Sequence, residues 1–417
     1  MYRYFLALAF AGGLCASAWA QTTRTNAAIE PAGPITLDQA LALALDANAE
    51  LSAARNEADA VNASITQANV LPNPDVSLLV EDTRRETRTT TVLFNQPIEL
   101  GGKRDARVKA ASRAHDAARA DLLAVRATTR ATVTAVFFDV LNAQEKCRLA
   151  EASLALAQHA TETVAKRVVA GKISPVEETR SRVASANIRL ALNQANSELA
   201  QARKRLAAIW GNPHPRFEHA VGELEQLPVL PDWPTLEQRL QQSPSLTRAR
   251  HEVARRDAML RVETSRRTPD VTVSMGVKRE EEAGRNQAVI GVSIPFPFFD
   301  RNQGNMLEAL RRTDKARDEL AAAEIRLDGE LSQAWQQLAN ARQEVEVLQR
   351  EILPGAQSAY DAASKGFAFG KFGFIDVLDA QRTLLEARSR YLQTLSEAHR
   401  AAAEMDRILG ESQVVIK

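Results

Sequence analysis

Three groups of residues in this chain of 417 residues have the types and spacing that chemistry requires. The first is the run Gly101-Gly102-Lys103-Arg104, which is similar to a phosphate-binding loop. Such a loop needs an earlier glycine at fixed spacing and a hydroxyl residue after the lysine to hold magnesium. Arg104 stands where that hydroxyl is required, so the run is better interpreted as a hinge between two kinds of structure.

The second group consists of the histidines and the cysteine that could bind a metal. The histidines are His115, His159, His214, His219, His251 and His399. None of them forms the i, i+4 pair with a carboxylate that a catalytic zinc helix uses. His214 and His219 are close in sequence but lie in a proline-rich segment, and Cys147 is interpreted as a small packed residue. The sequence therefore predicts no tight metal site, no catalytic residues and no cofactor.

The third group is the acidic pair Asp376 and Asp379, three residues apart at the start of an expected helix. Residues with this spacing lie on one helix face. One interpretation is helix capping, since acidic residues in a first turn complement the helix dipole. The other is a ring of carboxylates around an opening, if several copies of the chain assemble. One residue can serve both purposes, and the two interpretations stay open.

The first twenty residues predict a secretory signal peptide. Arg3 precedes an apolar run over residues 5–14, and residues 18–20 (Ala-Trp-Ala) form a cleavage site. Cys15 does not follow a small residue, so we expect it to be removed with the signal rather than lipidated. Cys147 is then the only cysteine of the mature chain, and no intramolecular disulfide is expected.

Composition limits the remaining function classes. The formal net charge is +1, and it falls to about zero once Arg3 is removed with the signal. A neutral chain without a long basic block gives no indication of nucleic-acid binding. No second apolar stretch approaches the length of a membrane helix. If the exported protein sits in a membrane, only a β-barrel remains to hold it there.

The sequence contains an internal duplication, in which the same short runs occur twice in the same order. Short runs recur about 195 to 199 residues apart, for example Thr36-Leu37-Asp38-Gln39 and Thr235-Leu236-Glu237-Gln238. The predicted divisions are a signal peptide (1–20), an N-terminal extension (21–34), a first repeat (35–211), a linker (212–234), a second repeat (235–410) and a C-terminal tail (411–417). Each repeat is expected to hold a helical segment, a β-hairpin and a long helical hairpin.

Alternation with a period of two predicts the hairpins. Val273, Met275 and Val277 alternate with Thr272, Ser274, Gly276 and Lys278, and Ile290 and Val292 share one face of the return strand. Val76, Leu78, Val80, Val92 and Phe94 form the corresponding pattern in the first repeat. An ordinary soluble hairpin with one apolar face would also fit this pattern.

Glycine and proline mark where the long helices begin and turn. No glycine or proline occurs from Lys103 to Ala170, which predicts a helix of roughly 100 Å at 1.5 Å per residue. The expected strand–helix hinges are Pro97, Gly101, Gly102, Pro295, Pro297 and Gly304. The expected turns at the tips of the helical hairpins are Gly171, Lys172, Gly370 and Lys371.

Four strands cannot close a barrel by themselves, and an open edge in lipid leaves backbone groups unpaired. Three copies provide twelve strands, an even number within the range of outer-membrane barrels. The predicted fold class is therefore mainly α with a small β-barrel: a homotrimeric tube with four strands per protomer that continue into a long α-helical coiled-coil barrel.

This order of elements after a signal peptide resembles the TolC family of trimeric outer-membrane efflux channels, from Ile35 to Gly410. Four motifs are similar to its cobalt–zinc–cadmium resistance branch: Val80-Glu81-Asp82-Thr83-Arg84, Pro97-Ile98-Glu99-Leu100-Gly101-Gly102-Lys103-Arg104, Phe299-Asp300-Arg301-Asn302-Gln303-Gly304-Asn305 and Asp376-Val377-Leu378-Asp379-Ala380-Gln381-Arg382. The resemblance implies a location in the outer membrane of a Gram-negative cell, with the helical tube in the periplasm.

The resemblance also implies function and partners. It implies export of heavy-metal cations together with a periplasmic adaptor and an inner-membrane resistance–nodulation–division (RND) pump. It places Asp376 and Asp379 at the periplasmic aperture, although Phe372 stands where a family member has an arginine for a salt-bridge latch. Two other functions remain open: an exit duct for drugs or other organic solutes, and a periplasmic coiled-coil scaffold.

Overall fold

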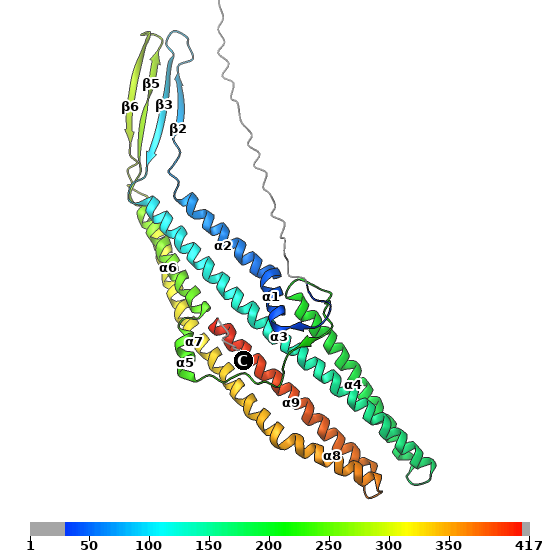
Figure 1. Cartoon of the computed structure of the whole chain (residues 1–417). Coiled ribbons are helices and arrows are strands. Elements are labelled where there is room, and N and C mark those ends of the chain that lie inside the picture. The colour runs from blue at the N-terminus through cyan, green and yellow to red at the C-terminus, as the bar shows by residue number, and fades with distance from the viewer. Residues whose placement is uncertain (1–29, 411–417) are drawn as a thin grey trace, which may run out of the picture.

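The computed structural model of the chain describes residues 30–410. A four-stranded sheet stands at one end, and long helices run away from it to two helical tips at the other end (Figure 1). The predicted signal peptide with Cys15, the first part of the N-terminal extension and the tail 411–417 lie outside the described residues. Within the described part no helix is both long enough and apolar enough to span a membrane.

The sheet combines the two predicted hairpins. Its strands are all antiparallel to their neighbours and follow the order β2 (Asp75–Glu81), β3 (Thr89–Ile98), β5 (Val271–Glu280) and β6 (Arg285–Ser293). The register places Phe94 opposite both Val76 and Met275, and Met275 opposite Ile290. The apolar positions singled out in the sequence therefore share one face, whereas Leu79, Leu93 and Val289 lie on the other face. The first of these faces is exposed in the single chain, where Ile290 is 83% and Val76 71% exposed.

The helical segment expected at the start of each repeat is broken into two helices. The pieces are α1 (Leu37–Ala47), α2 (Ala49–Ala68), α5 (Trp233–Leu240) and α6 (Pro244–Ser265). Asn48 has an extended backbone, and its side chain accepts a hydrogen bond from the N–H of Leu51 and donates one to the carbonyl of Ile209. Ser243 caps α6 in the same manner. Caps of this kind favour helix starts, and periodicity alone did not reveal them.

The long helices begin and end close to the predicted positions. They are α3 (Lys103–Val169), α4 (Pro175–Ala208), α7 (Gln303–Val347), α8 (Leu353–Ala368) and α9 (Phe374–Leu409). The five-residue π-helix η1 (Leu348–Ile352) joins α7 to α8. It ends two residues before Pro354, which lacks the N–H that a regular α-helix would use there.

A second layer covers one side of α3 near the middle of the molecule. It contains α1, the residues of the proline-rich linker, and a small parallel sheet of β1 (Ile35–Thr36) and β4 (Ala220–Val221). Phe137 and Leu141 of α3 are buried in one apolar cluster with Ile35 and Phe217 of this layer. The layer therefore has a fixed position on α3.

Glu30 holds the N-terminal end of this layer in place through hydrogen bonds. Its carboxylate accepts hydrogen bonds from the indole N–H of Trp210 (3.2 Å), the amide of Asn212 (2.5 Å) and the backbone N–H groups of Arg216 (2.6 Å) and Phe217 (3.3 Å). Burial alone would raise the pKa of Glu30, but these four donors outweigh it and lower the pKa. The carboxylate is therefore charged and ties the N-terminal segment to the linker.

Candidate functional site

The first strand–helix junction contains two glycines in the left-handed region. Gly101 has φ +70° and Gly102 has φ +71°. A Cβ atom on Gly101 would lie 2.6 Å from Cβ of Thr268, whereas a Cβ on Gly102 would meet nothing within 4 Å. Pro97 lies inside β3, which pairs with β2 as far as Asn95 and with β5 as far as Ile98. On the β5 side the pairing therefore continues past Pro97.

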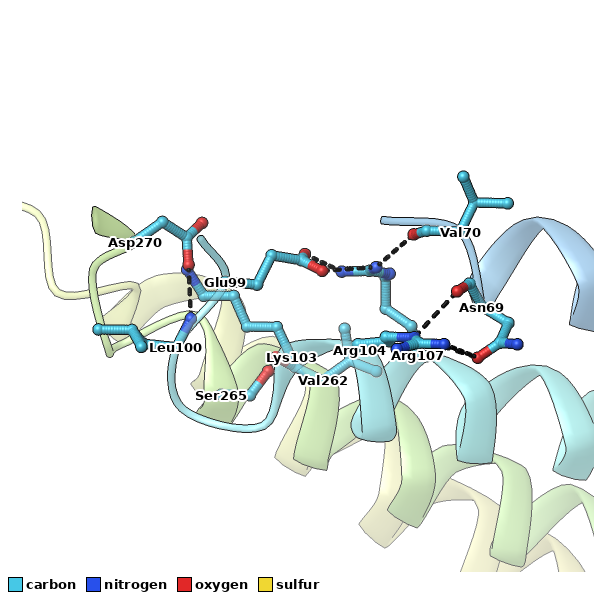
Figure 2. Close-up of polar contacts among 10 residues, drawn as sticks. All are labelled: Asn69, Val70, Glu99, Leu100, Lys103, Arg104, Arg107, Val262, Ser265 and Asp270. Carbon is cyan, nitrogen blue, oxygen red and sulfur yellow. Dashed lines mark hydrogen bonds and ion pairs between the residues drawn. The ribbon is translucent and has the colours of Figure 1, made fainter. Parts of the chain in front are cut away.

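Ion pairs join this junction to the neighbouring elements (Figure 2). The ammonium of Lys103 lies 2.7 Å from Asp270, which also accepts a hydrogen bond from the N–H of Leu100 at 3.1 Å. Arg107 forms a two-pronged pair with Glu99, and this hydrogen bonding raises the pKa of Arg107. The charged residues after Gly102 therefore hold the start of α3 against the base of the sheet and do not face an open phosphate site.

Arg104, which takes the place of the hydroxyl residue in a phosphate loop, binds the end of α2. Its guanidinium donates to the backbone carbonyl (2.9 Å) and the side-chain oxygen (2.8 Å) of Asn69. Figure 2 shows Arg104 and Arg107 directed toward the segment of Asn69 and Val70. The junction thus connects α2, β3, α3 and the start of β5.

The second junction turns with an asparagine. Pro295 and Pro297 lie in the segment between β6 and α7, whereas Gly304 lies in the first turn of α7. The residue with left-handed backbone is Asn302, at φ +60°. Its side-chain amide donates to the carbonyl of Glu263 at 2.8 Å and to the carboxylate of Glu263 at 2.9 Å. Sequence analysis missed Asn302 because only glycine was considered for positive φ.

The two tips repeat one hydrogen-bonding pattern. Gly171 (φ +67°) and Gly370 (φ +73°) follow the ends of α3 and α8. The N–H of Lys172 donates to the carbonyl of Arg167 at 2.9 Å, and that of Lys371 donates to Gly366 at 2.8 Å. This is the Schellman arrangement, which requires a left-handed residue at the glycine position. The backbones of both lysines therefore serve the turns.

The acidic pair lies at the start of α9, beside the second tip. Asp376 and Asp379 are both exposed. Asp376 accepts a hydrogen bond from the N–H of Gly373 at 2.8 Å, which caps the helix. The hydroxyl of Thr383 donates to the backbone carbonyl of Asp379 and leaves its carboxylate at the surface. The capping interpretation thus has direct geometric support at Asp376, and the ring of carboxylates remains a proposal.

Arg167 is a tip residue that sequence analysis missed. Its guanidinium donates to the carbonyls of Phe367 (2.8 Å) and Ala368 (2.9 Å) and stacks over the ring of Phe367 at 4.3 Å. The end of α3 is thereby tied to the end of α8. A positive charge interacts favourably with the carbonyls at a helix C-terminus, but nothing in the sequence indicates that Arg167 of α3 would bind the end of another helix, α8.

The histidines and Cys147 do not come together as a metal site. Within residues 30–410 no group of three or more histidine, cysteine, aspartate or glutamate side chains could hold a metal ion. His399 is buried, stacks on Phe138 and lies 2.9 Å from the carbonyl of Leu224, and burial lowers its pKa. Burial likewise raises the pKa of the Cys147 thiol. Both residues are therefore neutral packing groups.

A comparison with protein families identifies the family to which this chain belongs. The model of the family "outer membrane efflux protein" matches residues 40–212 and 235–411. The chain belongs to this family. The family is that of channel proteins in the outer membrane, and the resemblance inferred from the sequence motifs is confirmed.

Among curated proteins, this outer membrane efflux protein is similar to two metal-resistance proteins of Cupriavidus metallidurans. It is 50% identical to the cobalt-zinc-cadmium resistance protein CzcC, over 91% of either chain. It is 29% identical to the nickel and cobalt resistance protein CnrC, over 73% of this chain and 71% of the relative.

Solved structures show the same fold at low identity. The Campylobacter jejuni CmeC outer membrane channel has a TM-score of 0.77 at 16% identity and covers 90% of this chain and 85% of its own. The channel protein CusC has a TM-score of 0.76 at 18% identity, over 90% of this chain and 92% of its own. The mainly helical, TolC-type channel fold is therefore shown for this efflux protein.

Proposed function

We propose that the protein is the outer-membrane exit duct for divalent metal cations in an efflux system with a periplasmic adaptor and an inner-membrane RND pump. The observation that carries the proposal is the 50% identity to a cobalt-zinc-cadmium resistance protein over 91% of both chains. Export of drugs or other organic solutes is the competing function. A free periplasmic scaffold is set aside because the family is one of outer-membrane channels.

The function is tested by deleting the gene and comparing tolerance to zinc, cobalt and cadmium with tolerance to hydrophobic drugs. The expected result is sensitivity to the metals alone, restored by the intact gene. Sensitivity to drugs with unchanged metal tolerance would establish the competing function instead.

The proposed active form is a homotrimer with a 12-stranded barrel. The support is that β2 and β6 are the outer strands of a four-stranded sheet whose apolar face is exposed. Lipid is the expected contact of that face. Ile290→Arg should then weaken membrane assembly by about 2–4 kcal/mol, whereas Ser274→Arg on the polar face should have a mild effect. Equal effects of the two substitutions would contradict this placement.

The tip of α9 is the proposed periplasmic aperture. In a trimer, Asp376 and Asp379 would contribute six carboxylates to a narrow passage, and such a ring favours cations. Asp376→Asn keeps a side-chain oxygen for the cap but removes the charge, whereas Asp376→Ala removes both. If the ring operates, Asp376→Asn together with Asp379→Asn lowers cation selectivity in planar bilayers without unfolding the protein. If only the cap matters, Asp376→Ala destabilises α9 and the asparagine variants retain wild-type selectivity.

The two-repeat organisation is also a proposal, with the boundaries 35–211 and 235–410. Its support is that both segments contain the same order of helices, β-hairpin and long helical hairpin. The tie from Arg167 to the end of α8 then joins the tips of the two repeats. We infer that this tie holds the tips together when the duct is closed.

A further inference from the structure

A polar groove lies over α3, between α4 and α9. Its volume is about 240 Å³. At about 30 Å³ per molecule, this is room for about eight waters, and a small solute fits easily. The groove is lined mainly by charged and amide side chains: Asp139, Asn142, Lys146, Glu198, Gln201, Arg205 and Arg400.

The groove lies on the side of α3 away from the second layer. Gln144 of α3 faces that layer, because its amide donates to the carbonyl of Ala220 (3.0 Å) and accepts from the N–H of Ala220 (2.7 Å). Successive residues of a helix are rotated by about 100°. Asp139, Asn142 and Lys146 therefore lie roughly opposite the face of Gln144 and Phe137, and the layer leaves the groove open.

The charged side chains that line the groove have a net positive charge. Asp139 is paired with Arg400 at 2.7 Å and also accepts a hydrogen bond from Ser396. Glu198 accepts a hydrogen bond from Gln194 at 3.0 Å. In the described part of the chain, the side chains of Lys146 and Arg205 form neither a hydrogen bond nor an ion pair. Two cations therefore face one carboxylate that has no ion-pair partner of its own.

Asn142 adds a requirement for a hydrogen-bond donor. The residue is only 8% exposed, and its side-chain oxygen is buried without a partner among the described residues. A buried acceptor that lacks a donor destabilises the folded chain, so a bound molecule that supplies an O–H group is favoured. A divalent metal is disfavoured, because the cations of the groove repel it.

We propose that this groove binds a small oxyanion that also carries a hydroxyl group, of the hydrogenphosphate class. The charged oxygens lie between Lys146 and Arg205, which suits the preference of ammonium and guanidinium groups for phosphate. The hydroxyl donates to the side-chain oxygen of Asn142 once the amide turns this buried oxygen toward the groove. An oxyanion without a hydroxyl, such as sulfate, satisfies the cations but not Asn142.

In the trimer of the proposed function, the groove of each copy lines the bore, because a second layer inside the tube would block the passage. This location rests on the proposed function, but the binding of the anion does not. Three occupied grooves neutralise a ring of positive charge that otherwise opposes the passage of cations.

Calorimetric titration of the detergent-solubilised full-length protein with inorganic phosphate, and separately with sulfate, tests the proposal. We expect saturable phosphate binding and weaker sulfate binding. Lys146→Gln and Arg205→Gln should each weaken phosphate binding about tenfold or more, because each removes a charge-assisted contact. Asn142→Ala should remove the preference for phosphate over sulfate.

The matched control is Arg148→Gln. Arg148 is another exposed cation of α3, paired with Glu145 at 2.8 Å, on the side of the helix that bears Gln144. It should leave phosphate binding unchanged, and circular dichroism shows whether each variant is folded. Absence of saturable phosphate binding to the folded wild-type protein, equal binding of sulfate, or an equal loss in Arg148→Gln overturns the proposal. Metal tolerance of cells is a separate readout, so failure here leaves the proposed function intact.

Discussion

The two strand–helix junctions occupy the same place in the two halves of the chain, but they turn with different residues. The first uses Gly101 and Gly102, at φ +70° and +71°, and is held by the Lys103–Asp270 ion pair. The second uses Asn302 at φ +60°, held by the hydrogen bonds of its own side chain to Glu263. Both junctions need a left-handed residue before a long helix begins.

The difference between the junctions shows at which position only glycine is tolerated. Asparagine tolerates the left-handed region better than most residues, because its short polar side chain forms local hydrogen bonds. Gly101 cannot be replaced in this way, since a Cβ would collide with Thr268. The left-handed backbone therefore explains why asparagine can occupy position 302. The close approach of two segments explains why position 101 requires glycine.

The largest expected effect is that of Gly101→Val. Valine combines an unfavourable left-handed backbone with overlap against Thr268, and these costs add to about 3 kcal/mol or more. We expect loss of assembled protein from the outer membrane, measured by membrane fractionation, and a lower thermal unfolding midpoint in detergent.

The matched control for Gly101→Val is Gly102→Asn, because Gly102 has the same backbone conformation without the close approach. This variant should assemble normally. Equal loss of assembly in both variants would show that the collision with Thr268 is not the reason for glycine at position 101.

The next effect is that of Asn302→Val, with Asn302→Gly as its comparison. Valine disfavours positive φ and loses the two hydrogen bonds to Glu263, so we expect destabilisation by about 2 kcal/mol. Glycine keeps the backbone conformation and should lose only the hydrogen bonds. Thermal unfolding of the two variants separates these contributions. If glycine is as harmful as valine, the side-chain contacts and not the backbone decide this junction.

These junctions also show how far the sequence predicts the structure. Period-two alternation placed most apolar residues of the four strands on one face, because successive side chains of a strand point to opposite faces of the sheet. Glycine and proline located the long helices and both tips, since these residues act through the local backbone. Local signals of this kind are readable from the sequence.

Contacts between distant segments were not readable. Arg167 binds carbonyl groups about 200 residues further along the chain, and Glu30 binds the end of α4 and the linker. Phe137 and Leu141 of α3 are buried by a second layer that the sequence did not predict. Such partners depend on the tertiary fold, which periodicity within one helix does not report.

The beginnings of the two halves give a further comparison and a smaller effect. Glu30 is buried and has four donors, whereas Asp232 caps α5 by accepting a hydrogen bond from the N–H of Thr235 at 3.2 Å. Glu30→Gln should lower stability by about 1–2 kcal/mol near neutral pH, because a charged acceptor of buried N–H groups is lost. Asp232→Asn should have little effect, since asparagine also caps helices.

This prediction has a pH dependence with a definite sign. The pKa of Glu30 is lowered from its ordinary value of 4.5, so its contribution is present above that value and is lost as the pH falls through the lowered pKa. The difference in unfolding midpoint between wild type and Glu30→Gln should therefore close in acid. A difference that persists unchanged in strong acid would mean that packing, and not the charge of Glu30, holds the N-terminal segment.

The smallest expected effect has the opposite sign. Gly304 lies in the first turn of α7, has no positive φ, and a Cβ there would meet nothing within 4 Å. Gly304→Ala should therefore stabilise the protein by up to about 1 kcal/mol, because alanine restricts the unfolded chain and favours helix. Gly102→Ala is the contrast, since alanine at φ +71° should destabilise the protein by about 1–2 kcal/mol. Thermal unfolding in detergent gives both signs in one experiment. A destabilised Gly304→Ala protein would mean that position 304 needs glycine after all, as the sequence alone suggested.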